Sequence, residues 1–216
     1  MTGSDRATFG EARWHDAWRE VDARPPEGLH ADLVTRYTEP HRAYHTLQHL
    51  EECFAALDAT AHLATRAAEV ELALWFHDAI YDTHAGDNEE QCAVWAARAL
   101  VDGGAPADAA ARVAQLVRMT KHDAMPVDGD AVLLVDIDLA ILGAAPPRFA
   151  EYEAQVRHEY AWVPEEAFRA GRAAILTTFL GRAHIYGTPW FADELEARAR
   201  SNLARSIEAL GATAPL

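Results

Sequence analysis

The sequence predicts an all-α fold, and three observations lead to that prediction. Apolar residues recur at steps of three and four along nearly the whole chain, which places them on one face of a helix. The breaks between these segments carry Pro, Gly and Asp, residues that are typical of turns. No segment stands out as the partner of a β-strand. We therefore expect one helical bundle of about nine or ten helices.

The first five helices follow from this periodicity and from the turns between them. Pro25-Pro26 separates the first helix from the second, and Glu39-Pro40 ends the second. Asp87, with Glu90 three residues later, has the pattern of a capping box at the start of the fifth helix. These helices are predicted at residues 10–23, 29–38, 44–59, 64–82 and 87–101.

The other five helices complete the chain. Gly103-Gly104 forms the turn before the sixth helix, and Pro164 starts the ninth. The segment AVLLVDIDLAILG is rich in β-branched residues, but its neighbours are helical, so we interpret it as helix. These helices are predicted at residues 106–120, 130–142, 146–160, 164–180 and 189–210. We expect a single domain over residues 1–216, with its core at about 10–210.

The composition indicates a folded cytoplasmic domain and excludes two classes of partner. The 216 residues are 50% hydrophobic, enough to bury a substantial core. The net charge of −15 argues against a nucleic-acid polymer or an anionic membrane surface, but not against a small anionic substrate. No stretch resembles a signal peptide or reaches the roughly 20 apolar residues of a membrane span. We expect Cys53 and Cys92 to be free core residues rather than a disulfide.

The most informative motif is Phe76-His77-Asp78-Ala79, which lies inside the apolar run LALWFHDAIY. Burying an ionised carboxylate is unfavourable by several kcal/mol unless a cation or hydrogen bonds compensate it. A bound metal ion is the simplest compensation, and His77 would then be a further ligand. The alternative is that Asp78 is a carboxylate at a helix end near solvent.

Two other segments place potential metal ligands in apolar helices. His45 and His49 are four residues apart and would share one helix face, unless both are solvent-facing histidines. Asp136 and Asp138 interrupt the apolar segment AVLLVDIDLAILG, and we expect one of them to hold a backbone group or a ligand histidine. Mixed imidazole and carboxylate ligation suits Mn, Mg, Ni, Co, Zn or Fe without selecting one.

The dipeptide His-Asp occurs twice more and provides internal comparisons. His15-Asp16 has no histidine before it on a matching face, so we interpret it as a solvated surface pair. His122-Asp123 follows Lys121 at a predicted helix end. There Lys121 and His122 could contact a substrate phosphate or help to hold a second metal ion.

Five segments together resemble a bacterial family of HD-superfamily metal-dependent phosphohydrolases, over roughly residues 10–210. They are YHTLQHL, ELALWFHDAIYD, DIDLAILG, YEAQVRHEYAWV and FLGRAHIYGTPWF. The resemblance implies an HD-domain-like helical fold with a ligand set of His, His-Asp and a final Asp. On this chain the ligands would be His49, His77, Asp78 and Asp138, with Asp136 as the alternative to Asp138.

The resemblance also implies a proton donor. In the related cyclic-nucleotide phosphodiesterases, a histidine four residues before the first ligand protonates the leaving oxygen, and His45 has that position here. The alternative is that His45 only hydrogen-bonds a ligand carboxylate. Tyr81 and Arg157 are further candidates for binding substrate, with core packing and an internal salt bridge as their respective alternatives.

The implied function is hydrolysis of a small phosphorylated substrate, with a nucleotide as the expected class. A phosphomonoester, phosphodiester or pyrophosphate bond would be cleaved by metal-activated water, with one or two divalent ions per chain and Asp78 as a catalytic ligand. Two alternatives stay open. One is an HD-type di-iron oxygenase, which would need further histidines such as His84 or His122. The other is a non-catalytic metal- or ligand-binding domain. Separately, the sequence leaves open whether the protein forms a homodimer.

Overall fold

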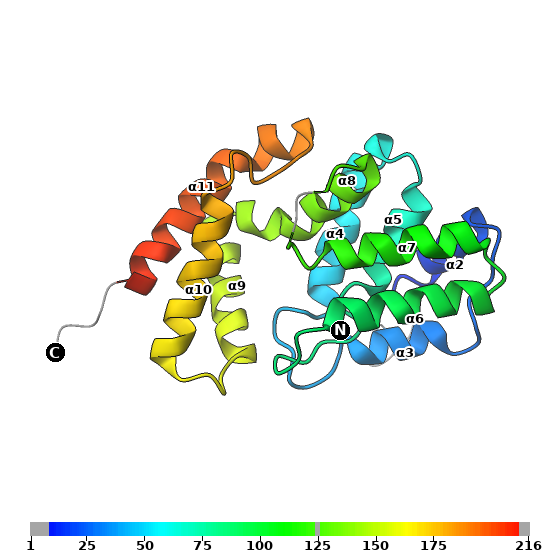
Figure 1. Ribbon diagram of the computed structural model, residues 1–216, viewed down its shortest axis with the longest axis horizontal. Coiled ribbons are helices and arrows are strands. Elements are labelled where there is room, and N and C mark those ends of the chain that lie inside the picture. The colour runs from blue at the N-terminus through cyan, green and yellow to red at the C-terminus, as the bar shows by residue number, and fades with distance from the viewer. Residues whose placement is uncertain (1–8, 124–125, 212–216) are drawn as a thin grey trace. The chain divides into compact units, whose positions relative to one another are not determined.

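The computed structural model describes residues 9–123 and 126–211, and every regular element in these residues is a helix (Figure 1). The all-α prediction is confirmed. The first helices are α2 (Glu11–Glu20), α3 (Leu29–Arg36), α4 (Leu47–Thr60), α5 (Ala67–Phe76), α6 (Asn88–Asp102), α7 (Ala107–Met119) and α8 (Gly129–Asp138). They are followed by α9 (Pro146–Glu159), α10 (Glu165–Leu180) and α11 (Pro189–Gly211). Two short 3₁₀ helices are η1 (Ala61–Leu63) and η2 (Leu139–Gly143).

The helices group into two compact units, one ending at Val135 and the other beginning at Asp136. In the first unit α5 is central, because it contacts α2, α4, α6 and α7. It can take this place because its C-terminal half is apolar on all sides: the five residues from Leu72 to Phe76 have no exposed surface. The helices α6 and α7 run side by side (Figure 1). The single domain stays a prediction.

An aromatic cluster fixes α2 against α5. Trp14 is fully buried, and its ring centroid lies 5.2 Å from that of Trp75 in an edge-to-face arrangement. Such a pair contributes about 0.5–1.5 kcal/mol beyond the area that it buries. At Gly10 the backbone has φ 61°, and a Cβ atom would lie 2.9 Å from the Trp75 ring, so this approach requires glycine. The position of α5 is thereby set.

In the second unit, α10 packs against α11, and α11 also contacts η2. Polar side chains link the helices of this unit. The side-chain amide of Asn202 donates to the carbonyl of Leu142 at 2.8 Å and to that of Ala144 at 2.9 Å. Arg172 of α10 forms an ion pair with Glu153 of α9.

Two helix boundaries differ from the prediction at the residues that matter most. The helix expected at 44–59 begins at Leu47, so His45 precedes it. The helix expected at 64–82 ends at Phe76, so His77 and Asp78 follow its last turn. The segment AVLLVDIDLAILG is helical as predicted, first as α8 and then as η2.

Two findings bear on the expectations from composition. Cys53 and Cys92 are both buried, and they do not form a disulfide, as predicted. Within the described part of the chain, no helix has both the length and the apolar character needed to cross a membrane.

Candidate metal centre

Helix α4 presents an imidazole and a thiol to the core of the first unit. Thr46 is its N-cap residue, and the hydroxyl accepts a hydrogen bond from the backbone N–H of Gln48 at 3.3 Å. His49, in the first turn, is 2% exposed. Cys53 lies four residues further along the same face and is also buried.

The C-terminal end of α5 supplies a second imidazole and a carboxylate. His77 is the C-cap residue, and its Nδ1–H donates to the carbonyl of Leu74 at 2.7 Å. A carbonyl can only accept, so this bond places the proton of the neutral ring on Nδ1 and leaves the Nε2 lone pair available. His77 is therefore oriented as a metal ligand through Nε2.

Three ligand atoms converge at this point. The Nε2 atoms of His49 and His77 are 3.1 Å apart. Oδ2 of Asp78 lies 3.0 Å from Nε2 of His77 and 3.6 Å from Nε2 of His49. Ligands at about 2.1 Å from one ion lie about 3.0 Å apart at right angles and about 3.4 Å apart in a tetrahedron. The three side chains therefore fit around a single ion.

The histidines stabilise the ionised form of Asp78. Its side chain is 19% exposed, and burial by itself raises the pKa of a carboxyl group. When the His77 ring also carries a proton on Nε2, its charge and its hydrogen bond to the carboxylate act together with the neighbouring His45 and His49. These effects outweigh burial and hold the pKa of Asp78 well below its usual range. Asp78 is thus ionised at neutral pH, as metal binding requires.

Cys53 lies beside the two histidines. Its Sγ atom is 3.7 Å from Nε2 and 3.8 Å from Nδ1 of His49. The ligand atoms of His49, Cys53 and His77 all lie within 4.8 Å of one another, so these residues could hold a metal ion. We expected Cys53 only as a core residue. Its spacing of four from His49 on a helix is the signal that could have placed it here.

His45 does not share a helix face with His49, and that prediction is wrong. The chain turns before α4, where the N–H of Thr46 donates to the carbonyl of Tyr44 at 2.7 Å. The His45 ring still lies close to the centre, with its centroid 6.1 Å from that of His49. It stacks on Tyr81 at 4.1 Å with an interplanar angle of 28°. Tyr81 therefore supports the His45 imidazole.

The second unit shows what Asp136 does. Its Oδ1 accepts the N–H of Gly187 at 2.8 Å, and its Oδ2 accepts the N–H of Thr188 at 2.7 Å. Both oxygens therefore hold the turn before α11, which is the structural role expected for one of the two aspartates. Asp138, the last residue of α8, is partly exposed. Its assignment as a ligand stays a prediction.

The remaining candidates for binding substrate are Lys121, His122 and Arg157. Lys121 pairs with Asp123 at 3.2 Å, and both side chains are exposed. His122 follows the end of α7 with φ 59°. Arg157 pairs with Glu165 at 2.9 Å, so the salt-bridge alternative is confirmed for this residue. A role in binding substrate stays a prediction for all three.

The first of the two comparison dipeptides is a surface pair, as predicted. His15 and Asp16 are exposed on α2, and Asp16 pairs with Arg19 at 2.8 Å. The same two residue types thus occur in opposite environments at His15-Asp16 and His77-Asp78. Asp16 therefore offers a matched control for substitutions at Asp78.

Comparison with known proteins assigns no family: no family model, no curated protein and no solved structure matches this chain. The resemblance to the HD superfamily therefore stays a prediction from its motifs.

Proposed function

We propose that this protein is a metal-dependent phosphohydrolase acting on a small phosphorylated substrate, with a nucleotide as the expected class. One observation carries the proposal: Nε2 of His49, Nε2 of His77 and Oδ2 of Asp78 converge within 3.6 Å in a largely buried position. A charged carboxylate with two imidazoles in such surroundings favours a bound cation. The motifs that resemble the HD superfamily favour hydrolysis as the chemistry.

His49, His77 and Asp78 would hold the ion, with Asp138 as the proposed further ligand. Asp138 follows the fully buried Leu134 by one turn on the same face of α8, which suits an inward-facing carboxylate. When bound, a divalent ion would lower the pKa of a coordinated water and polarise the phosphoryl oxygens.

Cys53 narrows the expected metals. Thiolate ligands suit Zn and Fe, whereas Mg prefers carboxylate, carbonyl and water oxygens. With Sγ 3.7 Å from Nε2 of His49, a thiolate at Cys53 would bias the site away from Mg. The number of ions per chain stays open between one and two.

His45 would protonate the leaving oxygen. An alkoxide leaves poorly, and an imidazolium near its working pKa can donate a proton to it. The ring is supported by Tyr81, and its charge is among those that lower the pKa of Asp78. His45→Ala should therefore retain metal and lose turnover.

The test is a screen of nucleotides, cyclic nucleotides and pyrophosphate with Mg, Mn, Ni, Co, Fe and Zn. We expect hydrolysis by the wild-type protein and loss of both metal and activity in Asp78→Ala. Asp16→Ala removes the same residue type from the exposed dipeptide and should leave both unchanged. A folded Asp78→Ala protein that hydrolyses at the wild-type rate would refute the proposal. Stoichiometric paired iron after anaerobic purification, with substrate-dependent oxygen consumption, would instead support the oxygenase alternative.

A further inference from the structure

Arg42 is a buried cation that lies outside the predicted ligand set. Its side chain has no exposed surface, although arginine is seldom fully buried unless it is paired. Its Nε donates to Oε2 of Glu39 at 3.1 Å, so a carboxylate neutralises its charge. The other donors of the guanidinium are hydrogen-bonded to backbone carbonyls and not to Glu39.

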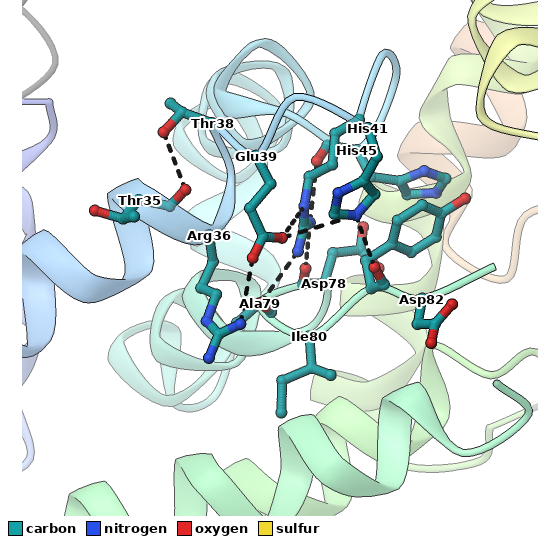
Figure 2. Close-up of polar contacts among 12 residues, drawn as sticks. Thr35, Arg36, Thr38, Glu39, His41, His45, Asp78, Ala79, Ile80 and Asp82 are labelled. Atoms are coloured by element: carbon teal, nitrogen blue, oxygen red, sulfur yellow. Dashed lines mark hydrogen bonds and ion pairs between the residues drawn. The ribbon is translucent and has the colours of Figure 1, made fainter. Parts of the chain in front are cut away.

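These carbonyls belong to the two segments that build the candidate site. Nη1 donates to the carbonyl of His45 at 3.1 Å and to that of Asp78 at 2.6 Å. Nη2 donates to the carbonyl of Ala79 at 3.1 Å. One planar side chain thus joins the segment before α4 to the turn after α5. Figure 2 shows residues of both segments, with Glu39 and His45 from the first close to Asp78 and Ala79 from the second. A lysine could not replace it, because an ammonium group lacks the rigid fork of donors.

Aromatic rings extend this contact to the imidazole of His45. The Arg42 guanidinium lies 5.4 Å from the ring centroids of both Tyr37 and Tyr81. Tyr81 in turn stacks on the His45 ring at 4.1 Å. Arg42 therefore reaches His45 twice, through the His45 carbonyl and through Tyr81.

We propose that Arg42 is a positioning residue that fixes the position of the proton donor His45 relative to Asp78. The inference rests on the proposed function, because it assigns His45 the role of general acid. The guanidinium contacts the turn after α5 through the backbone carbonyls of Asp78 and Ala79. The proposed ligand atoms are instead side-chain atoms of His49, His77 and Asp78, to which it donates no hydrogen bond. Loss of the Arg42 fork therefore displaces the acid and leaves metal binding in place.

Arg42→Lys keeps the positive charge and removes the fork of guanidinium donors. The effect on the general acid His45 is measured by comparing kcat for two esters that differ in their leaving group. An alkyl phosphate needs protonation of its leaving oxygen, whereas 4-nitrophenyl phosphate does not. We expect kcat to fall roughly tenfold or more with the alkyl ester, with little change for the nitrophenyl ester. KM and metal content should be unchanged. Arg36→Lys is the matched control, since Arg36 also pairs with Glu39 at 3.2 Å but lies half exposed.

A double-mutant cycle with His45→Ala completes the test. If Arg42 acts through His45, the double variant should be no slower than His45→Ala alone, because the same step is already lost. Additive losses, or equal losses for both esters, would overturn the inference. If His45→Ala itself has no leaving-group dependence, the acid role in the proposed function fails instead.

Histidine NMR tests the inference without relying on enzymatic activity. In ¹⁵N-histidine NMR spectra, Arg42→Lys should shift the His45 ring resonances, because the stacking on Tyr81 changes, and should leave those of His49 and His77 in place. Unchanged His45 resonances would overturn the inference. If Arg42→Lys does not fold, Glu39→Gln removes the carboxylate that pairs with Arg42. It should shift the His45 ring resonances in the same way but by less, with those of His49 and His77 unchanged. Unshifted His45 resonances in this variant would equally overturn the inference.

Discussion

At His77 a single hydrogen bond decides which ring nitrogen can bind a cation. The Leu74 carbonyl accepts a hydrogen bond from Nδ1–H, and Nε2 is left facing His49 and Asp78. At Asp136 the opposite holds, because both carboxylate oxygens are already used by backbone N–H groups. Asp78 and Asp136 are both acidic residues in apolar segments, but only Asp78 has an oxygen that faces two imidazoles. The difference lies in their hydrogen-bond partners.

Cys92 provides a prediction at the same scale. Burial raises the pKa of its thiol to about 12, and Sγ accepts the N–H of Ile80 at 3.2 Å. The reactive thiolate is therefore scarce at pH 8. In a Cys53→Ser background, where Cys92 is the one remaining cysteine, we expect alkylation by iodoacetamide to be far slower than in the urea-unfolded protein. Equal rates by mass spectrometry would contradict this.

At the scale of elements, the ends of two helices build the site. Helix α4 begins after His45, and helix α5 ends before His77, so both histidines lie where the chain leaves or enters a helix. Functional side chains at such ends can converge from different directions, whereas side chains inside a helix are restricted to its faces. The turns next to α4 and α5 therefore position His45, His77 and Asp78, while α4 itself positions His49.

The N-cap of α4 is predicted to stabilise this arrangement. Thr46→Ala removes the hydroxyl that accepts the Gln48 N–H, and we expect the free energy of unfolding to fall by about 1 kcal/mol. Thr46→Ser keeps the acceptor and should stay close to wild type. Urea denaturation of the three proteins measures the difference, and an alanine variant as stable as the serine variant would argue against the cap.

Periodicity predicted the helices well because the burial of one face is encoded within each segment. The apolar run around His77 and Asp78 also singled out these two residues, since polar residues in such a run are visible locally. The choice of His49 as a ligand came from the resemblance to the HD superfamily. The exact ends of α4 and α5 were missed because they depend on capping at Thr46 and at His77. The role of Asp136 depends on Gly187 and Thr188, about fifty residues away in the sequence. Such long-range contacts leave no local signal.

At the scale of the whole molecule, the net charge of −15 favours cations over polyanions. An acidic protein can still bind a small phosphorylated substrate if a cation sits between the two. The candidate centre of His49, His77 and Asp78 provides such a place within the first unit. The proposed function thus agrees with both the overall charge and the local geometry.

The most direct test is anomalous diffraction from crystals of the protein loaded with cobalt. We predict an ion about 2.0–2.2 Å from Nε2 of His49, Nε2 of His77 and a carboxylate oxygen of Asp78. The exposed His15-Asp16 dipeptide serves as the internal control and should show no ion. Cobalt bound elsewhere, or an empty site at saturating cobalt, would contradict the metal centre on which the account depends.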